Sequence, residues 1–302
     1  MADDSVPPVT SLPRRTFLLG AGAALGAVAC GSERATSATS TTSFGPAFVL
    51  IASFPQGDPY AVPGVPQRLP FLIAKGGDAP IDKIDGTLSF TVAQKGTPVG
   101  PPVTVTPHSE GLTRAYLPLE FTFPATGVYD ITSNYRGADL TATIQVVPPD
   151  QVTLPQRNAP LPPLDTPTSA DARGVDPICT HDPPCPLHEK NLADSLHAGR
   201  PVAMLLATPK FCQTAICGPV LDELLAAATG RSDIDFIHVE PYANPLAVAS
   251  IAQAEPSPLT TAYGMTFEPC LFVTNRAGVL VRRLDTIYDR TELAAALDDA
   301  VA

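Results

Sequence analysis

Two cysteines, Cys212 and Cys217, lie at the junction of two segments with different hydrophobic patterns. Residues 202–207 are continuously apolar, which predicts a strand buried on both faces of a sheet. Apolar residues then recur at helical spacing over residues 220–228. A thiol at the start of a helix lies near the partial positive charge of the helix N-terminus, which stabilises thiolate over thiol. The pattern therefore predicts a reactive sulfur at a strand-to-helix turn.

A second group, Cys179, Cys185 and His188, lies upstream and could in principle bind a metal. Its spacing matches no common zinc motif. In an exported protein, two nearby cysteines more often form a disulfide. We therefore expect a structural disulfide between Cys179 and Cys185, and we expect neither a metal nor a cofactor.

The remaining cysteine and histidines of the C-terminal half carry weaker signals. Cys270 is expected to be a buried core residue on a strand, and the alternative is a third sulfur beside the reactive pair. His181, His197 and His238 show no partner in the sequence, so they are expected to be solvated or in the core.

The start of the chain is typical of an export signal. Residues 1–29 contain Arg14-Arg15, which resembles a twin-arginine motif, and then an uncharged Gly/Ala/Leu stretch too short to span a bilayer. Small residues before Cys30 resemble a bacterial lipobox, in which the cysteine is lipidated and becomes the new N-terminus. Ala27 stands where leucine is usual, and cleavage nearby without a lipid is the alternative. Residues 30–43 are a Ser/Thr-rich tether. We expect an extracytoplasmic protein that is lipid-anchored to the bacterial cell membrane.

The charge balance excludes some classes of partner. The net charge is −11 over 302 residues, which argues against nucleic acid as a partner and against a basic membrane-binding face. The only membrane contact expected is therefore the lipid anchor.

Residues 44–147 show an all-β pattern, and a sandwich is expected. Short runs at residues 47–53, 69–74, 87–93, 103–105, 113–117, 128–134 and 140–147 are separated by Gly, Pro and Asp turns. The segment around Tyr129 resembles the tyrosine corner of immunoglobulin-like domains, in which the hydroxyl bonds back to the chain, with Ile131 in place of the cysteine. His108 is the single histidine and there is no cysteine, so the expected role is spacing or docking. Residues 148–170 are proline-rich and predict a stiff, extended linker outside any core.

Residues 171–302 predict the order helix, strand, helix, strand, helix, strand, strand, helix. The first helix is expected behind Pro186, and Asn244-Pro245 is an N-cap and N1 pair that is expected to open a short helix. Asp289 begins a capping-box-like sequence at the start of the last helix. Over residues 187–302 this region resembles the thioredoxin-like family. The cysteines lie at the strand-to-helix turn, residues 218–223 resemble the proline-bearing part of the family's active-site helix, and residues 263–273 resemble its cis-proline segment. The resemblance implies an α/β thioredoxin-like fold, with a cis Glu268–Pro269 bond facing the cysteines.

The chain departs from the family pattern at the cysteines. Thioredoxins carry Cys-x2-Cys, whereas four residues separate the pair here. Residues five apart in a helix are too distant for a disulfide, so Cys212 must lie outside the helix if it pairs with Cys217. Phe211 takes the place of the usual tryptophan, and the family's buried aspartate aligns near Met204. A proton acceptor is thus missing, and Glu268 is a candidate substitute.

The resemblance implies thiol-disulfide exchange with exported thiol or disulfide proteins, or with a redox partner. Cys212 would attack, Cys217 would resolve, and Pro269 would shape the substrate groove. A non-catalytic binding module with a structural Cys212–Cys217 disulfide is the alternative. A second alternative is a peroxiredoxin-like peroxidase that uses Cys217, because Thr214 and Cys217 match the Thr-x2-Cys core of that family. Pro209, however, lies one residue too far upstream for the family's full motif.

Overall fold

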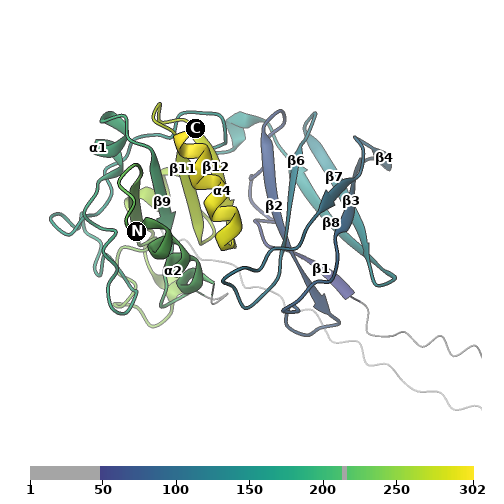
Figure 1. The fold of residues 1–302 in the computed structure, drawn as a ribbon, viewed down its shortest axis with the longest axis horizontal. Helices are drawn as coiled ribbons and strands as arrows, with labels where there is room; N and C mark the ends of the chain where they lie inside the picture. The colour runs from purple at the N-terminus through teal and green to yellow at the C-terminus, as the bar shows by residue number, and fades with distance from the viewer. Residues whose placement is uncertain (1–47, 213–215) are drawn as a thin grey trace, which may run out of the picture. The chain divides into compact units, whose positions relative to one another are not determined.

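The computed structural model describes residues 48–212 and 216–302, and it places an all-β region ahead of a region of mixed helices and strands (Figure 1). These residues belong to one compact unit, Phe44–Ala302. Within the described residues, no helix is both long and apolar enough to cross a membrane. The twin-arginine motif, the lipidation candidate Cys30 and the Ser/Thr-rich tether lie outside the described residues.

The all-β region consists of two antiparallel sheets. One sheet has the order β1-β2-β6, and the other has the order β4-β3-β7-β8 with β5 paired to β3. The strands are β1 (Phe48–Ala52), β2 (Pro66–Lys75), β3 (Leu88–Gln94), β4 (Thr97–Pro98), β5 (Val103–Val105), β6 (Leu117–Thr122), β7 (Gly127–Tyr135) and β8 (Ala138–Val146).

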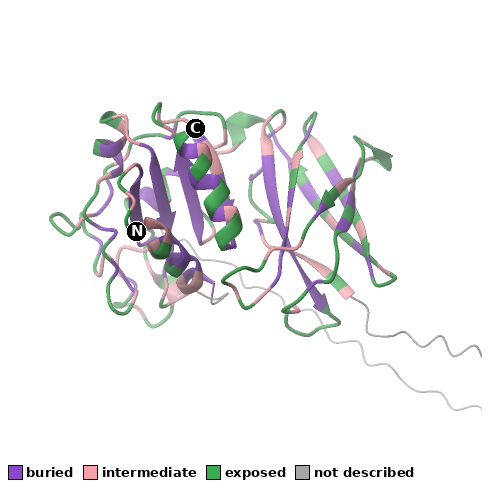
Figure 2. Cartoon of the chain, in the orientation of Figure 1, coloured by how far each residue is buried: buried purple, intermediate pink, exposed green. Residues whose placement is uncertain are grey.

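Inward side chains of both sheets share one hydrophobic core, which is what the alternating patterns of β3, β7 and β8 predict. Phe71 of β2 stacks on Phe90 of β3, with ring centroids 5.7 Å apart. The Tyr129 hydroxyl donates to the carbonyl of Ala125 at 2.8 Å, so the predicted bond back to the chain is confirmed. Figure 2 shows that β2 is mostly buried, because its second face packs against the mixed region.

One predicted strand of this region is misplaced. The run at residues 113–117 is expected to be a strand, but β6 begins only at Leu117 and continues through Pro118. Because β6 lies at the edge of its sheet, a proline inside it is tolerated.

The mixed region follows the predicted order of elements. It contains η1 (Pro149–Gln151), α1 (Leu192–His197), β9 (Val202–Leu206), α2 (Cys217–Ala228), β10 (Asp235–Val239), η2 (Ile251–Gln253), α3 (Pro258–Ala262), β11 (Cys270–Thr274), β12 (Leu280–Asp285) and α4 (Arg290–Val301). The sheet order is β10-β9-β11-β12, with β9 parallel to β10 and β11 antiparallel to both of its neighbours.

Two helix starts differ from the sequence prediction. The first helix was expected directly behind Pro186 but begins at Leu192, where the side chain of Asn191 accepts the free backbone N–H groups. Asn244-Pro245 was expected to open a helix and opens none; α3 begins later, with Ser257 as its cap.

The two faces of the mixed sheet belong to different cores. Met204 and Phe272 lie in the core that also contains the inward residues of the all-β region. Ala203, Leu205 and Leu271 lie in the core that contains the apolar faces of α2 and α4, the helices that cover one face of the sheet in Figure 1. The central strands β9 and β11 are therefore buried on both faces, as the continuous apolar run predicts.

The proline-rich segment is extended, but the expectation that it lies outside any core is wrong. It runs along the edge of β12, where the N–H of Asn158 donates to Leu280 at 2.8 Å and the N–H of Leu161 donates to Gly278 at 2.9 Å. Leu154 and Leu161 are buried in the shared core. An edge strand offers unpaired backbone groups, and this segment satisfies them.

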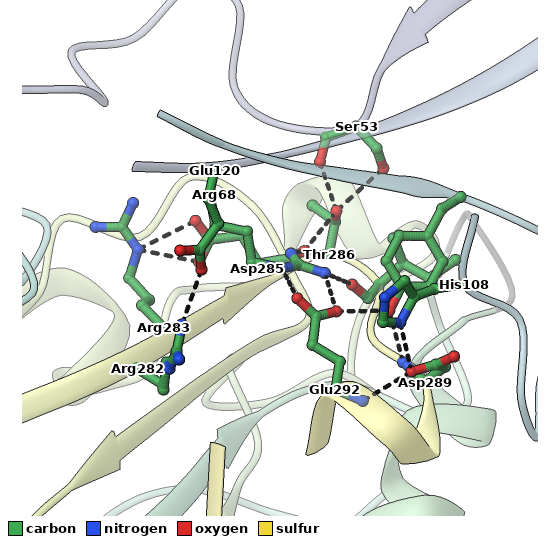
Figure 3. Close-up of polar contacts among 12 residues, drawn as sticks. Ser53, Arg68, His108, Glu120, Arg282, Arg283, Asp285, Thr286, Asp289 and Glu292 are labelled. Atoms are coloured by element: carbon green, nitrogen blue, oxygen red, sulfur yellow. Dashed lines mark hydrogen bonds and ion pairs between the residues drawn. The ribbon is translucent and has the colours of Figure 1, made fainter. Parts of the chain in front are cut away.

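A buried polar network joins the all-β region to β12 and α4 (Figure 3). Arg68 of β2 donates to the carboxylate of Glu292 at 2.7 Å and to the backbone carbonyl of Asp285 at 2.9 Å. Tyr116 also donates to Glu292, and His108 pairs with Asp289 at 3.0 Å. Since Arg68 is 2% exposed, its charge is compensated inside the protein and not by water.

Candidate functional site

Cys212 and Cys217 form a disulfide across the start of α2. Their Cα atoms are 5.9 Å apart, and Cys217 is the first residue of the helix whereas Cys212 precedes it. The expectation that Cys212 lies outside the helix is confirmed. Residues 213–215, including Thr214, lie outside the described residues.

The two sulfurs of this pair have unequal environments. Cys217 is fully buried among apolar residues, whereas Cys212 is half-buried. The side chain of Ile216, the cap residue of α2, accepts no hydrogen bond from the helix. The backbone N–H of Cys217 instead donates to the sulfur of Cys212 at 3.3 Å. Free N–H groups of a first turn carry the positive end of the helix dipole, so this contact favours a thiolate on Cys212.

Cys212 lines a cavity of about 710 Å³. The mixed region supplies one wall, which includes Ile216, Phe267 and Glu268. The all-β region supplies the opposite wall, which consists of residues 51–55, Leu72, Pro80 and Arg114. The all-β region therefore helps to form the surroundings of the accessible sulfur, a role that the sequence does not indicate.

The Glu268–Pro269 peptide bond is cis, as predicted. Pro269 itself is buried, and the residues just before it, Phe267 and Glu268, form the cavity wall. Pro269 therefore does not line the cavity itself, and it would shape a groove only through the positions of Phe267 and Glu268.

Glu268 is a proton-carrying group in the same cavity as the Cys212 sulfur. Its carboxylate accepts the N–H of Thr208 at 2.9 Å and the hydroxyl of Tyr242 at 3.4 Å. Burial raises the pKa of Glu268 to about 7, more than these hydrogen bonds lower it. Glu268 can therefore gain or lose a proton near neutral pH. Met204, at the position of the family's aspartate, is buried and carries no proton.

The second cysteine group is a buried cluster of four side chains: Cys179, Cys185, His188 and His238. Their ligand atoms all lie within 4.8 Å of one another. Both cysteines are free thiols in the structure, which contradicts the disulfide expected between them. The physical reason is that two imidazole nitrogens converge on the sulfurs, an arrangement that the spacing of the cysteines does not disclose.

His238 is the member of the cluster that the sequence missed. It lies on β10, and its Nε2 donates to the carbonyl of Ala207 at 3.0 Å, so the lone pair of Nδ1 faces the cluster. The backbone N–H of His238 donates to the carbonyl of Leu187 at 2.9 Å, which holds His238 against the loop that carries the other three members. No sequence spacing indicates this contact. The one available signal is a histidine among the apolar residues Phe236, Ile237 and Val239.

Hydrogen bonding between the two free thiols lowers the pKa of Cys179 and raises the pKa of Cys185. Both imidazoles add to the lowering at Cys179. The pair therefore loses its first proton readily, as a ligand for a cation must.

Glu240 is a buried carboxylate that contacts Thr180, the neighbour of Cys179. Its Oε2 accepts the hydroxyl of Thr180 at 2.8 Å, and that hydroxyl also lies 3.2 Å from the hydroxyl of Thr208. The buried Oε1 has no hydrogen-bond partner among the described residues. Burial raises the pKa of Glu240 to about 8.

Cys270 is a core residue and not a third sulfur of the reactive pair. Its thiol donates to Asp285 at 3.1 Å, and it lies in the core shared with the all-β region, whereas Cys217 lies in the other core. His181 contacts Asp222 at 3.3 Å, and His197 is exposed.

Comparison of the chain with protein-family models, with curated proteins and with solved structures found no match.

Proposed function

We propose that the chain is an extracytoplasmic thioredoxin-like protein that exchanges disulfides with exported proteins through Cys212 and Cys217. One observation carries the proposal. The half-buried sulfur of Cys212 accepts an N–H from the first turn of α2 and lines a cavity, while its partner sulfur is fully buried behind it. This asymmetry separates an attacking thiol from a resolving thiol.

In the reducing direction, the thiolate of Cys212 attacks one sulfur of a partner disulfide. The new bond joins Cys212 to the partner, and the partner's other sulfur leaves as a thiolate that takes up a proton. Cys217 then loses its proton and attacks Cys212, which restores the internal disulfide and releases the partner as a dithiol. Two electrons pass from the cysteine pair to the partner, and the oxidising direction is the reverse.

Glu268 supplies the proton acceptor for the resolving step. Its carboxylate lies in the same cavity as Cys212, and its pKa of about 7 suits proton transfer at neutral pH. It thus takes the place of the family's aspartate, from the cis-proline loop and not from the central strand.

The surroundings of the pair support the proposed domain type. A parallel β9–β10 pair precedes an antiparallel β11–β12 hairpin, α2 follows β9, and a cis-proline, Pro269, directly precedes β11. A peroxidase reaction at Cys217 is disfavoured, because that sulfur is fully buried and bonded to Cys212.

The experiment is trapping of mixed disulfides with a peptide that carries one disulfide. Cys217→Ser leaves Cys212 without its resolving partner, so it should accumulate the mixed disulfide, whereas Cys212→Ser should not. Cys270→Ser is the matched control, because serine keeps the hydrogen bond to Asp285.

If neither variant forms a mixed disulfide, the binding-module alternative stands. If Cys212→Ser traps as much as Cys217→Ser, the pair is active and the assignment of the attacking thiol is wrong.

Localisation has a separate test, because the export signal lies outside the described residues. Mass spectrometry of the mature N-terminus should find Cys30 lipidated. Two or more acyl chains on this residue would anchor the protein firmly, whereas one chain would bind the membrane only marginally. An unmodified N-terminus elsewhere would contradict the anchor and leave the redox proposal intact.

A further inference from the structure

The cluster that Cys179, Cys185 and His188 of the loop before α1 form with His238 of β10 has the donor spacing of a closed metal site. Nε2 of His188 lies 3.3 Å from Nδ1 of His238, and the sulfur of Cys185 lies 3.3 Å from each of these nitrogens. The sulfur of Cys179 lies 3.7 Å from Nδ1 of His238. In a tetrahedral zinc site with Zn–S bonds of about 2.3 Å and Zn–N bonds of about 2.0–2.1 Å, neighbouring ligand atoms lie roughly 3.3–3.8 Å apart.

We propose that Cys179, Cys185, His188 and His238 bind one zinc ion as a structural site. All four side chains are buried, so the site has four protein ligands and no open position for water or substrate, as structural zinc sites have. Two thiolates and two neutral imidazoles would balance the charge of Zn²⁺, so the occupied site is neutral in the core.

The outer contacts hold the ligands in the orientation that a cation needs. Nε2 of His238 donates to the backbone carbonyl of Ala207, which leaves Nδ1 as a lone pair aimed into the cluster. The N–H of Cys185 donates to the sulfur of Cys179 at 3.4 Å, a contact that stabilises a thiolate.

His188 presents its Nε2 to the cluster, 3.3 Å from the sulfur of Cys185 and from Nδ1 of His238. The ring is buried, with 3% of the residue exposed. When Nε2 binds the ion, Nδ1 carries the proton of the neutral imidazole. That nitrogen has no hydrogen-bond partner among the described residues, so the cluster itself provides the contacts of the His188 ring.

The donor set favours zinc over other biological cations. Two sulfurs and two imidazole nitrogens are too soft for Mg²⁺ or Ca²⁺, which take oxygen ligands. Two sulfurs and two imidazole nitrogens at this spacing match Zn²⁺, which has no redox chemistry and takes four such donors in tetrahedral Cys2His2 sites.

The ion would tie the loop to the turn that carries Cys212. Thr180, next to Cys179, contacts the hydroxyl of Thr208 at 3.2 Å and accepts the N–H of Lys210 at 3.4 Å. Zinc would therefore hold in place a loop that packs on the start of the Thr208–Cys212 turn.

The first test is the metal content of the full-length chain, purified without chelators and measured by plasma mass spectrometry. We expect one zinc per chain, retained in the control His197→Ala, an exposed histidine of α1, and lost from Cys185→Ser and from His238→Ala. Zinc that persists in both ligand variants would overturn the site.

The second test needs no variant and so does not depend on how variants fold. The metal is removed from the wild-type chain with a chelator, and Co²⁺ alone is then titrated under reducing conditions. We expect saturation at one equivalent, with intense visible bands of tetrahedral cobalt and a near-ultraviolet thiolate-to-metal band. No binding of Co²⁺, preferential isolation of copper, or a Cys179–Cys185 disulfide in the exported protein by non-reducing peptide mapping would each overturn the proposal.

Discussion

The two cysteine groups of this chain lie close to the same turn, yet their surroundings differ in ways that give sulfur opposite roles. Cys212 and Cys217 are joined in a disulfide, and the sulfur of Cys212 lines a cavity at a helix N-terminus. Cys179 and Cys185 are buried with His188 and His238. Access to a partner permits exchange, whereas enclosure by nitrogen donors favours a permanent ligand role.

The comparison shows that the spacing of two cysteines indicates their role less well than the side chains around them in the fold. Cys185 lies six positions after Cys179, and Cys217 lies five positions after Cys212, so spacing alone suggests two disulfides. The partners that distinguish the groups come from elsewhere in the chain: His238 from β10 and Glu268 from the cis-proline loop.

The largest expected effect is on exchange itself. Cys212→Ser should lower the rate of disulfide exchange with a peptide substrate by at least about a thousandfold, because the attacking sulfur is gone. Cys270→Ser should leave the rate unchanged. Residual exchange in Cys212→Ser near the wild-type rate would mean that another thiol reacts.

Removal of the metal should act on stability and not on the chemistry of the pair. Chelation under reducing conditions should lower the free energy of unfolding by about 3 kcal/mol, because only the folded chain holds the four ligands together. Thermal unfolding with and without chelator measures the change. Cys185→Ser should be less stable and insensitive to chelator, whereas His197→Ala should respond as the wild type does.

Glu240 should make stability depend on pH. Its pKa in the folded state is about 8, above its value in the unfolded chain, so the folded state binds the proton more tightly. Its contribution to stability is present below about pH 4.5 and is lost as pH rises through 8.

Glu240→Gln should remove this dependence and raise the free energy of unfolding at pH 9 by about 2 kcal/mol relative to the wild type. Denaturant unfolding at pH 5 and at pH 9 gives the comparison, and Glu255→Gln, an exposed acid, is the control. Equal effects of Glu240→Gln at both pH values would contradict the raised pKa of Glu240.

The smallest expected effect is on proton transfer. Because the pKa of Glu268 is about 7, its basic form increases through neutral pH, so the rate of the resolving step should rise across that range. Glu268→Gln should slow the step by about tenfold at pH 8 and abolish that inflection. Stopped-flow release of a mixed disulfide measures it, and an unchanged pH profile would leave the proton acceptor unassigned.

Much of the local structure follows from sequence pattern. The apolar run at residues 202–207 predicts β9, and the capping residue Asp289 marks the start of α4, because both signals lie within a few residues of the element they specify. The helix expected at Asn244-Pro245 does not form, although apolar residues follow the cap signal. Leu246 is exposed, so no packed face stabilises a helix there.

Both candidate sites depend on contacts between segments that are far apart in the chain, and the sequence pattern does not predict such contacts. The wall of the cavity around Phe54 belongs to the all-β region, more than 150 residues from Cys212. The proline-rich segment enters the core because β12 offers a free edge. Neither contact leaves a periodic signal in the chain.

The most direct test of the central claim is the reduction potential of the Cys212–Cys217 pair, measured by equilibration of the full-length chain with glutathione. If the half-buried sulfur at the start of α2 exchanges with partners, the potential should lie above about −300 mV, the region of exchanging disulfides. A potential below that limit, together with no mixed disulfide from Cys217→Ser, would contradict the claim and make the bond structural.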